Sequence, residues 1–397
     1  MEAVGGGAVA IGAASVTGAA DEDDDSDDDS NDQGGMLVII YDDSPSTDYT
    51  KAFPIHQEYD VPGCIAACPG LMEDHNEFLM PGQLEQIQDA GWEVMSHTVR
   101  HRLLAAVPVE EDVDESDTRI YAQTNSHGRF EGDPIEITGP DATATGVVAG
   151  DGEDDTGRYV ELEEPIGESF EAGPNVTIRY TEEFTREILE ESRSMLEEWG
   201  LDPVTGFIYT YDRQEYVEEL VPDHYEAVGN AHGVASGLNP EWEPDPFDLH
   251  RTYFETDRMD EDELGAFLDE IANEPDFGIL GGHSNFNTLP AERIEKTIEM
   301  ALERDIEIVT LQEALVRLDA LDEGVLADDN GDENGDDDGD GNGDDDGDDD
   351  QGSIGGNGEN GDDQGGDDDH GENGDDEGSW LSRIIDRIMS ALRSLFS

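Results

Sequence analysis

The sequence predicts an α/β fold that carries an inserted small all-β domain. The apolar run at 36–41, rich in β-branched residues, is typical of a strand buried in a parallel sheet. Helix and strand patterns alternate over 36–105 and again over 181–327. Between them, 106–180 consists of short strand-like runs separated by glycine and proline turns. Roughly 200 residues of α/β pattern interrupted by roughly 75 of β pattern suit one domain with an insertion.

The first α/β part follows an acidic linker at 21–35. Its apolar runs and helical spacing predict a strand at 36–41, a strand at 63–67, a helix at 80–90 and a strand at 92–96. Helical turns are also expected between 47 and 59, where Pro54 should interrupt them because proline removes a backbone donor. These elements together give a βαβαβ order.

The predicted β-domain at 106–180 has five strand-like runs, at 119–122, 134–137, 146–148, 158–162 and 175–180. It closely follows the segment 97–101, which begins and ends with histidine. It could therefore form one wall of a substrate groove, or it could be a packing module remote from substrate.

The α/β pattern resumes after the β-domain. It predicts a helix at 182–199 stopped by Gly200, a strand at 207–209, a helix at 261–272, a strand at 277–280, a helix at 290–303 with Pro290 near its first turn, a strand at 306–309 and a helix at 311–320. On pattern alone, a flavodoxin-like open sheet is one arrangement that these elements could adopt.

Two acidic residues and two histidines follow predicted strands. Asp42 and Asp43 come at the end of the first strand, which is where α/β folds place active groups. His97 and His101 follow the strand at 92–96, and their spacing puts both imidazoles on one side of a helical turn. Two histidines and one carboxylate can hold Zn²⁺ and leave a position open for water. The sequence therefore predicts a metal site.

These residues resemble motifs of the polysaccharide deacetylases of the NodB type, the fourth family of carbohydrate esterases. The family's Thr-Phe-Asp-Asp-Gly motif is approximated by Ile40-Tyr41-Asp42-Asp43-Ser44. Its His-Ser/Thr-x-x-His motif is matched at His97-Thr98-Val99-Arg100-His101. Its Leu-x-His motif has a version with one extra residue at Leu280-Gly281-Gly282-His283.

The resemblance implies a distorted (β/α) barrel for the α/β part of the chain. It also implies a divalent metal, with zinc as the first choice, bound by Asp43, His97 and His101. Asp42 would then be the general base and His283 the general acid. The implied reaction removes N-acetyl groups from a polysaccharide.

The family's Arg-x-Pro-Tyr motif has no clear counterpart, because the nearest segment, 207–211, contains neither arginine nor proline. Tyr211 is a candidate for an oxyanion or substrate contact, and Arg213 or Arg251 could supply the missing cation. Asp257 is a candidate for the group that tunes the acid histidine.

The chain is strongly acidic, with 103 Asp and Glu against 19 Lys and Arg and a formal net charge of −84. The excess extends beyond the two acidic tracts at 21–32 and 328–378 into the predicted domains. High salt screens such self-repulsion, so a halophilic source is the simplest account, with binding of basic partners or Ca²⁺ as alternatives. Nucleic-acid binding is disfavoured because phosphate contacts require a basic face.

The weakly apolar, small-residue segment at 1–20 resembles part of an export signal, although no basic residues precede it. A twin-arginine segment upstream of Met1 is one explanation of that lack. An extracellular or cell-surface location follows as an expectation. Cys64 and Cys68 are expected to be free, buried thiols, because residues four apart on a strand are too distant for a disulfide.

The C-terminal part combines a disordered Asp/Gly-rich spacer at 328–378 with an amphipathic helix at 379–397. Apolar residues recur every four positions between 380 and 396, and arginines lie mostly on the other face. Such a helix could contact an anionic membrane surface or the cell envelope, or it could fold back on the acidic catalytic domain.

The sequence therefore favours a secreted, metal-dependent deacetylase whose partner is an N-acetylated polysaccharide. A catalytically weak or inactive deacetylase-like protein that binds glycan or envelope is the first alternative. A hydrolase of the same fold that acts on a different C–N bond is the second.

Overall fold

The computed structural model describes residues 35–74, 77–233, 237–273, 276–322 and 324. The chain divides into two units, 1–34 and 35–397, and the first lies wholly outside the described residues. The expected export signal, almost all of the acidic linker, the spacer at 328–378 and the helix at 379–397 also fall outside them. No described helix is long and apolar enough to cross a membrane.

The larger of two sheets is built around β1 (Met36–Asp42), which pairs in parallel with β2 and β14. Its other members are β2 (Cys64–Ala67), β3 (Glu93–Ser96), β10 (Gly206–Phe207), β11 (Ala227–Val228), β12 (Asn239–Pro240), β13 (Thr252–Tyr253), β14 (Asp276–Gly282) and β15 (Glu307–Ile308). The strands expected at 36–41, 63–67, 92–96, 207–209, 277–280 and 306–309 are all present, the fourth and the last in shortened form.

The strand order is β11-β10-β3-β2-β1-β14-β12, and β13 pairs in parallel with β14. On one side of β1 the sheet follows the chain, in the order β1-β2-β3-β10-β11, and the late strand β14 pairs with β1 on its other side. In the flavodoxin-like order 2-1-3-4-5 the first strand lies between the second and the third, whereas here β2 lies between β1 and β3. The flavodoxin-like alternative is therefore wrong.

One face of the sheet encloses a separate apolar cluster. Val38, Ile40, Ala66, Met95, Ile208, Ala227, Phe277 and Ile279 all belong to it. Because strands from both ends of the order contribute to one cluster, the sheet must curl around it. Helix α7 (Leu311–Arg317) packs against this cluster through Leu311 and Leu315. Leu311 and Leu315 are fully buried, and removal of each side chain from water stabilises the fold by about 1.5–3 kcal/mol.

Helices cover the outer face of the larger sheet, where alternate residues of β1 such as Leu37 and Ile39 point. They are α1 (Phe53–Tyr59), α2 (Pro69–Asp74), α3 (Pro81–Gln88), α4 (Glu182–Glu198), α5 (Glu261–Asn273) and α6 (Ala291–Leu302). Contrary to expectation, Pro54 does not interrupt a helix. It lies in the first turn of α1, where a missing N–H costs nothing, and a π-helical segment (Asp48–Ala52) precedes it.

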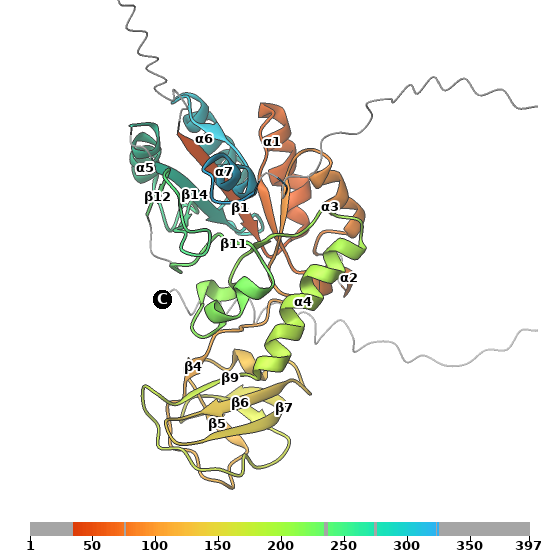
Figure 1. Cartoon of the computed structure of the whole chain (residues 1–397), viewed down its shortest axis with the longest axis vertical. Coiled ribbons are helices and arrows are strands. Elements are labelled where there is room, and N and C mark those ends of the chain that lie inside the picture. Colours follow the sequence, from red (N-terminus) through yellow and green to blue (C-terminus); the bar gives the residue numbers. More distant parts are fainter. Residues whose placement is uncertain (1–34, 75–76, 234–236, 274–275, 323, 325–397) are drawn as a thin grey trace, which may run out of the picture. The chain divides into compact units, whose positions relative to one another are not determined.

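The second sheet is antiparallel and lies between β3 and α4 in sequence (Figure 1). Its strands are β4 (Val107–Pro108), β5 (Arg119–Tyr121), β6 (Pro134–Thr138), β7 (Thr143–Glu153), β8 (Arg158–Leu162) and β9 (Thr177–Tyr180), in the order β4-β9-β6-β7-β8-β5. All five expected strands are present. β7 extends beyond the predicted 146–148 because a bulge between Val148 and Gly150 lets its pairing with β8 continue.

Polar contacts join the second sheet to the end of the larger one. Arg102 makes a bidentate ion pair with Asp133, with N–O distances of 2.8 and 3.2 Å. The Thr210 hydroxyl, just after β10, donates to the Arg102 carbonyl oxygen at 2.6 Å. The segment before β6 is thereby fixed next to the loop that follows β10.

Cys64 and Cys68 are free and buried, as expected. The Cys64 thiol faces the buried carboxylate of Glu93, which also accepts a hydrogen bond from the backbone N–H of Gln312 at 2.8 Å. Burial raises the pKa of Glu93 to about 7, although these hydrogen bonds oppose the shift.

We expect Glu93 to make folding stability depend on pH. Its pKa is about 7 in the folded chain and near 4.5 when unfolded, so its contribution is complete at low pH and is lost as the pH rises through about 7. The full difference corresponds to roughly 3 kcal/mol. Chemical denaturation should show that the free energy of unfolding falls less between about pH 5 and about pH 8 for Glu93→Gln than for the parent. Glu85→Gln, a change at an exposed residue of α3, should behave like the parent. If Glu93→Gln lost as much unfolding free energy as the parent, this assignment would be refuted.

Candidate metal centre

The candidate ligands lie at the carboxyl ends of β1 and β3. Asp42 ends β1, and the next residue, Asp43, has a left-handed backbone with φ of 73°. Residues 97–101 do not form the expected helical turn, because Thr98 and His101 also have positive φ, at 64° and 55°. Such conformations are costly for residues other than glycine and cluster at functional sites. They turn both imidazoles towards Asp43.

Asp43, His97 and His101 form a compact donor set. The Nε2 atoms of His97 and His101 lie 3.4 and 3.1 Å from Oδ1 of Asp43. Three donor atoms, one from each residue, lie within 4.8 Å of one another. Nitrogen and oxygen donors about 2.1 Å from a tetrahedral Zn²⁺ would be about 3.4 Å apart. The residues therefore fit a metal ion.

The protonation states of these groups also suit a metal. The Nδ1 atom of His97 donates to the carbonyl oxygen of Ile208 at 2.8 Å, which leaves the Nε2 lone pair free. Burial lowers the pKa of His101 and favours its neutral form. Burial would raise the pKa of Asp43, but His101, His97 and His283 together hold it well below its usual value. Neutral imidazoles and an ionised carboxylate are the forms that bind metals.

Asp42 is buried beside Arg251, which lies just before β13. The Nη1 atom of Arg251 donates to Oδ1 of Asp42 at 2.8 Å, and its Nη2 atom donates to Oδ1 of Asp212 at 2.9 Å. Asp212 also accepts from the Tyr253 hydroxyl at 2.7 Å. Burial would raise the pKa of Asp212, but Arg251 and the hydrogen bonds to Asp212 lower it. The buried guanidinium of Arg251 thus orients two carboxylates, and it does not hydrogen-bond Oδ2 of Asp42.

His283, just after β14, faces the same centre. Its Nε2 atom lies 4.0 Å from Oδ2 of Asp42 and 3.9 Å from Oδ2 of Asp43. Glu255 accepts hydrogen bonds from its Nδ1 atom at 2.9 Å and from its backbone N–H at 3.0 Å. Burial lowers the pKa of His283, but Glu255, Asp43 and Asp42 outweigh it and raise the pKa to about 10. The imidazole is thus held protonated, with one N–H directed towards the centre.

The loop that carries His283 is fixed by the π-helical segment. The Ser284 hydroxyl donates to buried Asp48, and Lys51 donates to the carbonyl oxygens of Ser284 and Leu289. Burial raises the pKa of Asp48 well above its usual value, and Asp43 and Asp42 add to this effect. The raised pKa favours the uncharged form of Asp48, which holds the loop through its hydrogen bond with Ser284.

Tyr211 borders the donor set, whereas Arg213 does not. The Tyr211 ring lies 4.5 Å from the His101 ring, and the Tyr211 hydroxyl accepts a hydrogen bond from Arg129. Arg213 instead pairs with Glu215 at 2.9 Å. The structure therefore brings Arg251, not Arg213, to Asp42.

The expectation for Asp257 is wrong. Asp257 is exposed, and Glu255, two residues earlier, holds His283. No local signal in the sequence marks Glu255, because β13 has only two residues, Thr252 and Tyr253, and Glu255 follows it outside any regular element.

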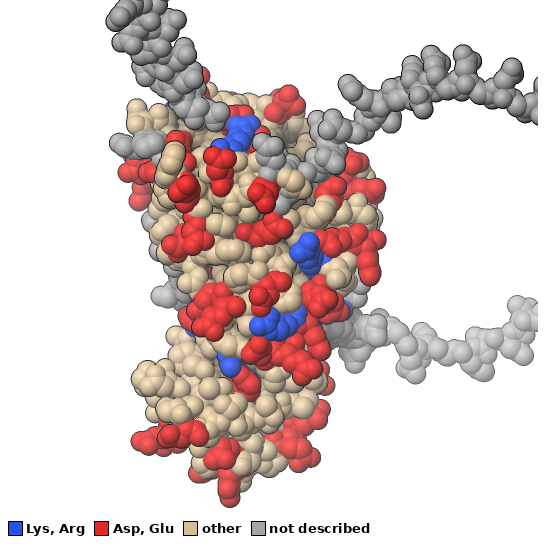
Figure 2. All heavy atoms as spheres, in the orientation of Figure 1, with Lys and Arg blue, Asp and Glu red and all other residues tan. Residues whose placement is uncertain are grey.

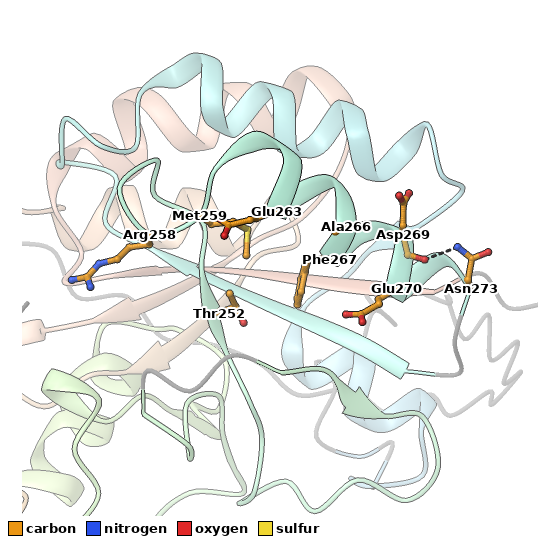
Figure 3. A pocket seen from close by; sticks show the side chains of 9 residues that line it. All are labelled: Thr252, Arg258, Met259, Glu263, Ala266, Phe267, Asp269, Glu270 and Asn273. Carbon is orange, nitrogen blue, oxygen red and sulfur yellow. Dashed lines mark hydrogen bonds between the residues drawn. The ribbon is translucent and has the colours of Figure 1, made fainter.

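A separate cavity lies between β13 and α5, with a volume of about 650 Å³. Figure 3 shows Thr252 and Phe267 on its walls, with Glu263 and Glu270 projecting from α5. Thr252 points to the opposite side of β13 from Arg251 and Tyr253. None of the metal-centre residues lines this cavity, so its size does not mark the chemical site.

Part of the chain matches a known family. Residues 29–130 match the polysaccharide deacetylase family model. The matched segment contains Asp42, Asp43, His97 and His101, which are the residues that carried the resemblance in the sequence. It ends before Arg251 and His283. The match therefore supports deacetylase chemistry for the metal-ligand half of the site.

No curated protein sequence matches the chain. Among solved structures, the Streptococcus pyogenes deacetylase PplD with acetate is 13% identical, covers 48% of this chain and has a TM-score of 0.28. This chain spans 53% of that one. The peptidoglycan deacetylase PdaC from Bacillus subtilis is 10% identical, with 72% of this chain and 91% of that chain covered and a TM-score of 0.38.

A third solved structure is described as a CE4 family pseudoenzyme from Bacillus anthracis. It is 12% identical, with 71% of this chain and 66% of that chain covered, and its TM-score is 0.37.

Proposed function

We propose that this protein is a metal-dependent hydrolase that removes N-acetyl groups from a polysaccharide. The observation that carries the proposal is the juxtaposition of three kinds of group. Nε2 of the protonated His283 lies 3.9 Å from Asp43, a member of the donor set, and 4.0 Å from Asp42, which directly precedes Asp43 in the chain. A base, an acid and a metal-ligand set are the groups that metal-assisted hydrolysis of an amide uses.

A divalent cation held by Asp43, His97 and His101, for which we propose zinc, would polarise the acetyl carbonyl and make a bound water more acidic. The protein's own groups move the protons. Asp42 takes a proton from the attacking water, while Arg251 holds the other carboxylate oxygen and keeps the free one in place.

The acid step belongs to His283. When the C–N bond of the tetrahedral intermediate breaks, the Nε2–H proton of His283 passes to the departing amine nitrogen. The products are acetate and a free amine. Glu255 orients the imidazole and stabilises its charged form. Tyr211, packed against the His101 ring, is the residue that we assign to positioning the acetyl group.

Further parts of the proposal concern architecture and environment. We take the curled sheet to be the distorted (β/α) barrel of NodB-type enzymes and the second sheet to be an inserted domain. Figure 2 shows acidic side chains spread over the visible face and basic ones at only a few places, which supports a high-salt environment. We also propose that the protein is secreted and that the amphipathic segment at 379–397 attaches it to a membrane or envelope.

The direct test is a product assay with metal-loaded protein and N-acetylated oligosaccharides in high salt. Stoichiometric release of acetate and free amine, blocked by a chelator and restored by added metal, is the expected result. Release of ammonia or of another acyl group would instead assign a different C–N hydrolase. Retained metal without any product would indicate a glycan-binding protein that does not turn over substrate.

A further inference from the structure

Arg129, in the connection between β5 and β6 of the second sheet, contacts Tyr211 beside the donor set. Its Nη1 atom donates to the Tyr211 hydroxyl, and its guanidinium carbon lies 5.5 Å from the centre of the Tyr211 ring. Tyr211 in turn packs against His101. An arginine from a sheet outside the α/β part therefore lies one side chain away from a proposed metal ligand.

The backbone that carries Arg129 is rigidly supported. It directly follows a 3₁₀ helix (Ser126–Gly128), in which a side chain at Gly128 would come within 2.5 Å of the Gly150 carbonyl oxygen. On its other side, the Phe130 ring packs under the guanidinium of Arg102 at 4.2 Å. The position of Arg129 is thus fixed by packing on both sides.

The charge of Arg129 has no carboxylate partner. Among the described residues, no carboxylate lies within 4 Å of its guanidinium, and the Tyr211 hydroxyl is the one acceptor of its side-chain hydrogen bonds. A guanidinium has five N–H donors, so most of these remain available. In the same part of the chain, Arg102 and Arg179 both pair with carboxylates.

This lack of a partner is informative in so acidic a protein. With 103 acidic residues in the chain, a half-buried arginine beside a site built for a cation would be expected to acquire a carboxylate. Its uncompensated charge is costly there, because Arg129 contacts Tyr211, which packs on His101, and a cation in this position would repel a bound metal. An anionic ligand group would remove that cost.

We propose that Arg129 binds a carboxylate of the substrate, so that the polysaccharide is an acidic one in which a uronic acid neighbours the N-acetylated sugar. This inference rests on the proposed deacetylase function. The planar fork of arginine matches a carboxylate with two parallel hydrogen bonds. The acidic surface repels polyanions at long range, but at about 1 M salt the Debye length is about 3 Å and the direct contact persists.

The test compares two substrates that differ in one charge. One is an oligosaccharide that alternates N-acetylglucosamine with glucuronate, and the other is its methyl ester. At about 1 M salt, the parent should prefer the free acid by at least about tenfold in kcat/KM. Arg129→Gln should abolish this preference, so that its kcat/KM on the free acid falls to its own value on the ester. Arg119→Gln, which removes a charge from β5 of the same sheet, should preserve the preference.

Two results would overturn the assignment. One is a parent without preference between acid and ester. The other is an Arg129→Gln variant that loses activity equally on both, because Arg129 would then serve only to position Tyr211. If no substrate releases acetate, the deacetylase proposal itself fails. Calorimetric binding of the acidic oligosaccharide to the full chain and to Arg129→Gln then decides the role of Arg129 separately, since equal affinities would refute it.

Discussion

Asp42→Asn is expected to reduce acetate release by at least about 10³-fold. The amide has nearly the same shape as the carboxylate and can still contact Arg251, but it cannot accept a proton from the attacking water. Because Asp42 is not one of the three donors that lie together, the variant should retain its metal. The measurements are kcat by acetate assay and metal content by elemental analysis.

The control for this prediction is Asp60→Asn. Asp60 is an exposed residue in left-handed conformation at the end of α1, where asparagine is equally tolerated. Its activity should equal that of the parent. If Asp42→Asn kept its metal and more than a tenth of the parent activity, Asp42 would not be the base.

His283→Gln is the second change with a large expected effect, a loss of about 10²–10⁴-fold in kcat. Glutamine can still donate a hydrogen bond, but it cannot supply a proton to the departing amine. His232→Gln, a change at a partly exposed histidine paired with Asp248, should leave activity unchanged. Equal activity of both variants would exclude His283 as the acid.

The pH dependence gives a second measure of His283. A general acid must be protonated, so activity is present below its pKa and is lost as the pH rises through it. The pKa of His283 is raised from 6.5 to about 10 without a metal, and a bound cation would lower it again. The alkaline limb of kcat should therefore fall between these values. Glu255→Gln should move it to lower pH, and an unmoved limb would mean that another group titrates.

Much of the donor set could be predicted from sequence because each of its parts is local. Asp42 and Asp43 end an apolar strand, and His97 and His101 belong to one short motif. The conformation between the histidines was not predictable in the same way. It depends on positive φ at Thr98 and His101, which the surrounding contacts impose rather than the residue type.

The groups that complete the site could not be identified because they depend on long-range pairing. β13 has only two residues, too few for a periodic signal, yet its pairing with β14 places Arg251 at Asp42 and Glu255 at His283. Asp212 likewise becomes relevant only when β10 lies beside β3. The same limit applied to the fold, since helix and strand periodicity does not specify strand order.

The central claim is that Asp43, His97 and His101 hold a catalytic metal. The most direct measurement is metal stoichiometry together with acetate release for the parent, Asp43→Ala and His97→Ala, with folding checked by circular dichroism. We expect about one divalent ion per parent chain, and loss of both metal and activity in the two folded variants. A parent that binds no metal, or folded variants that still bind metal and release acetate, would contradict the account.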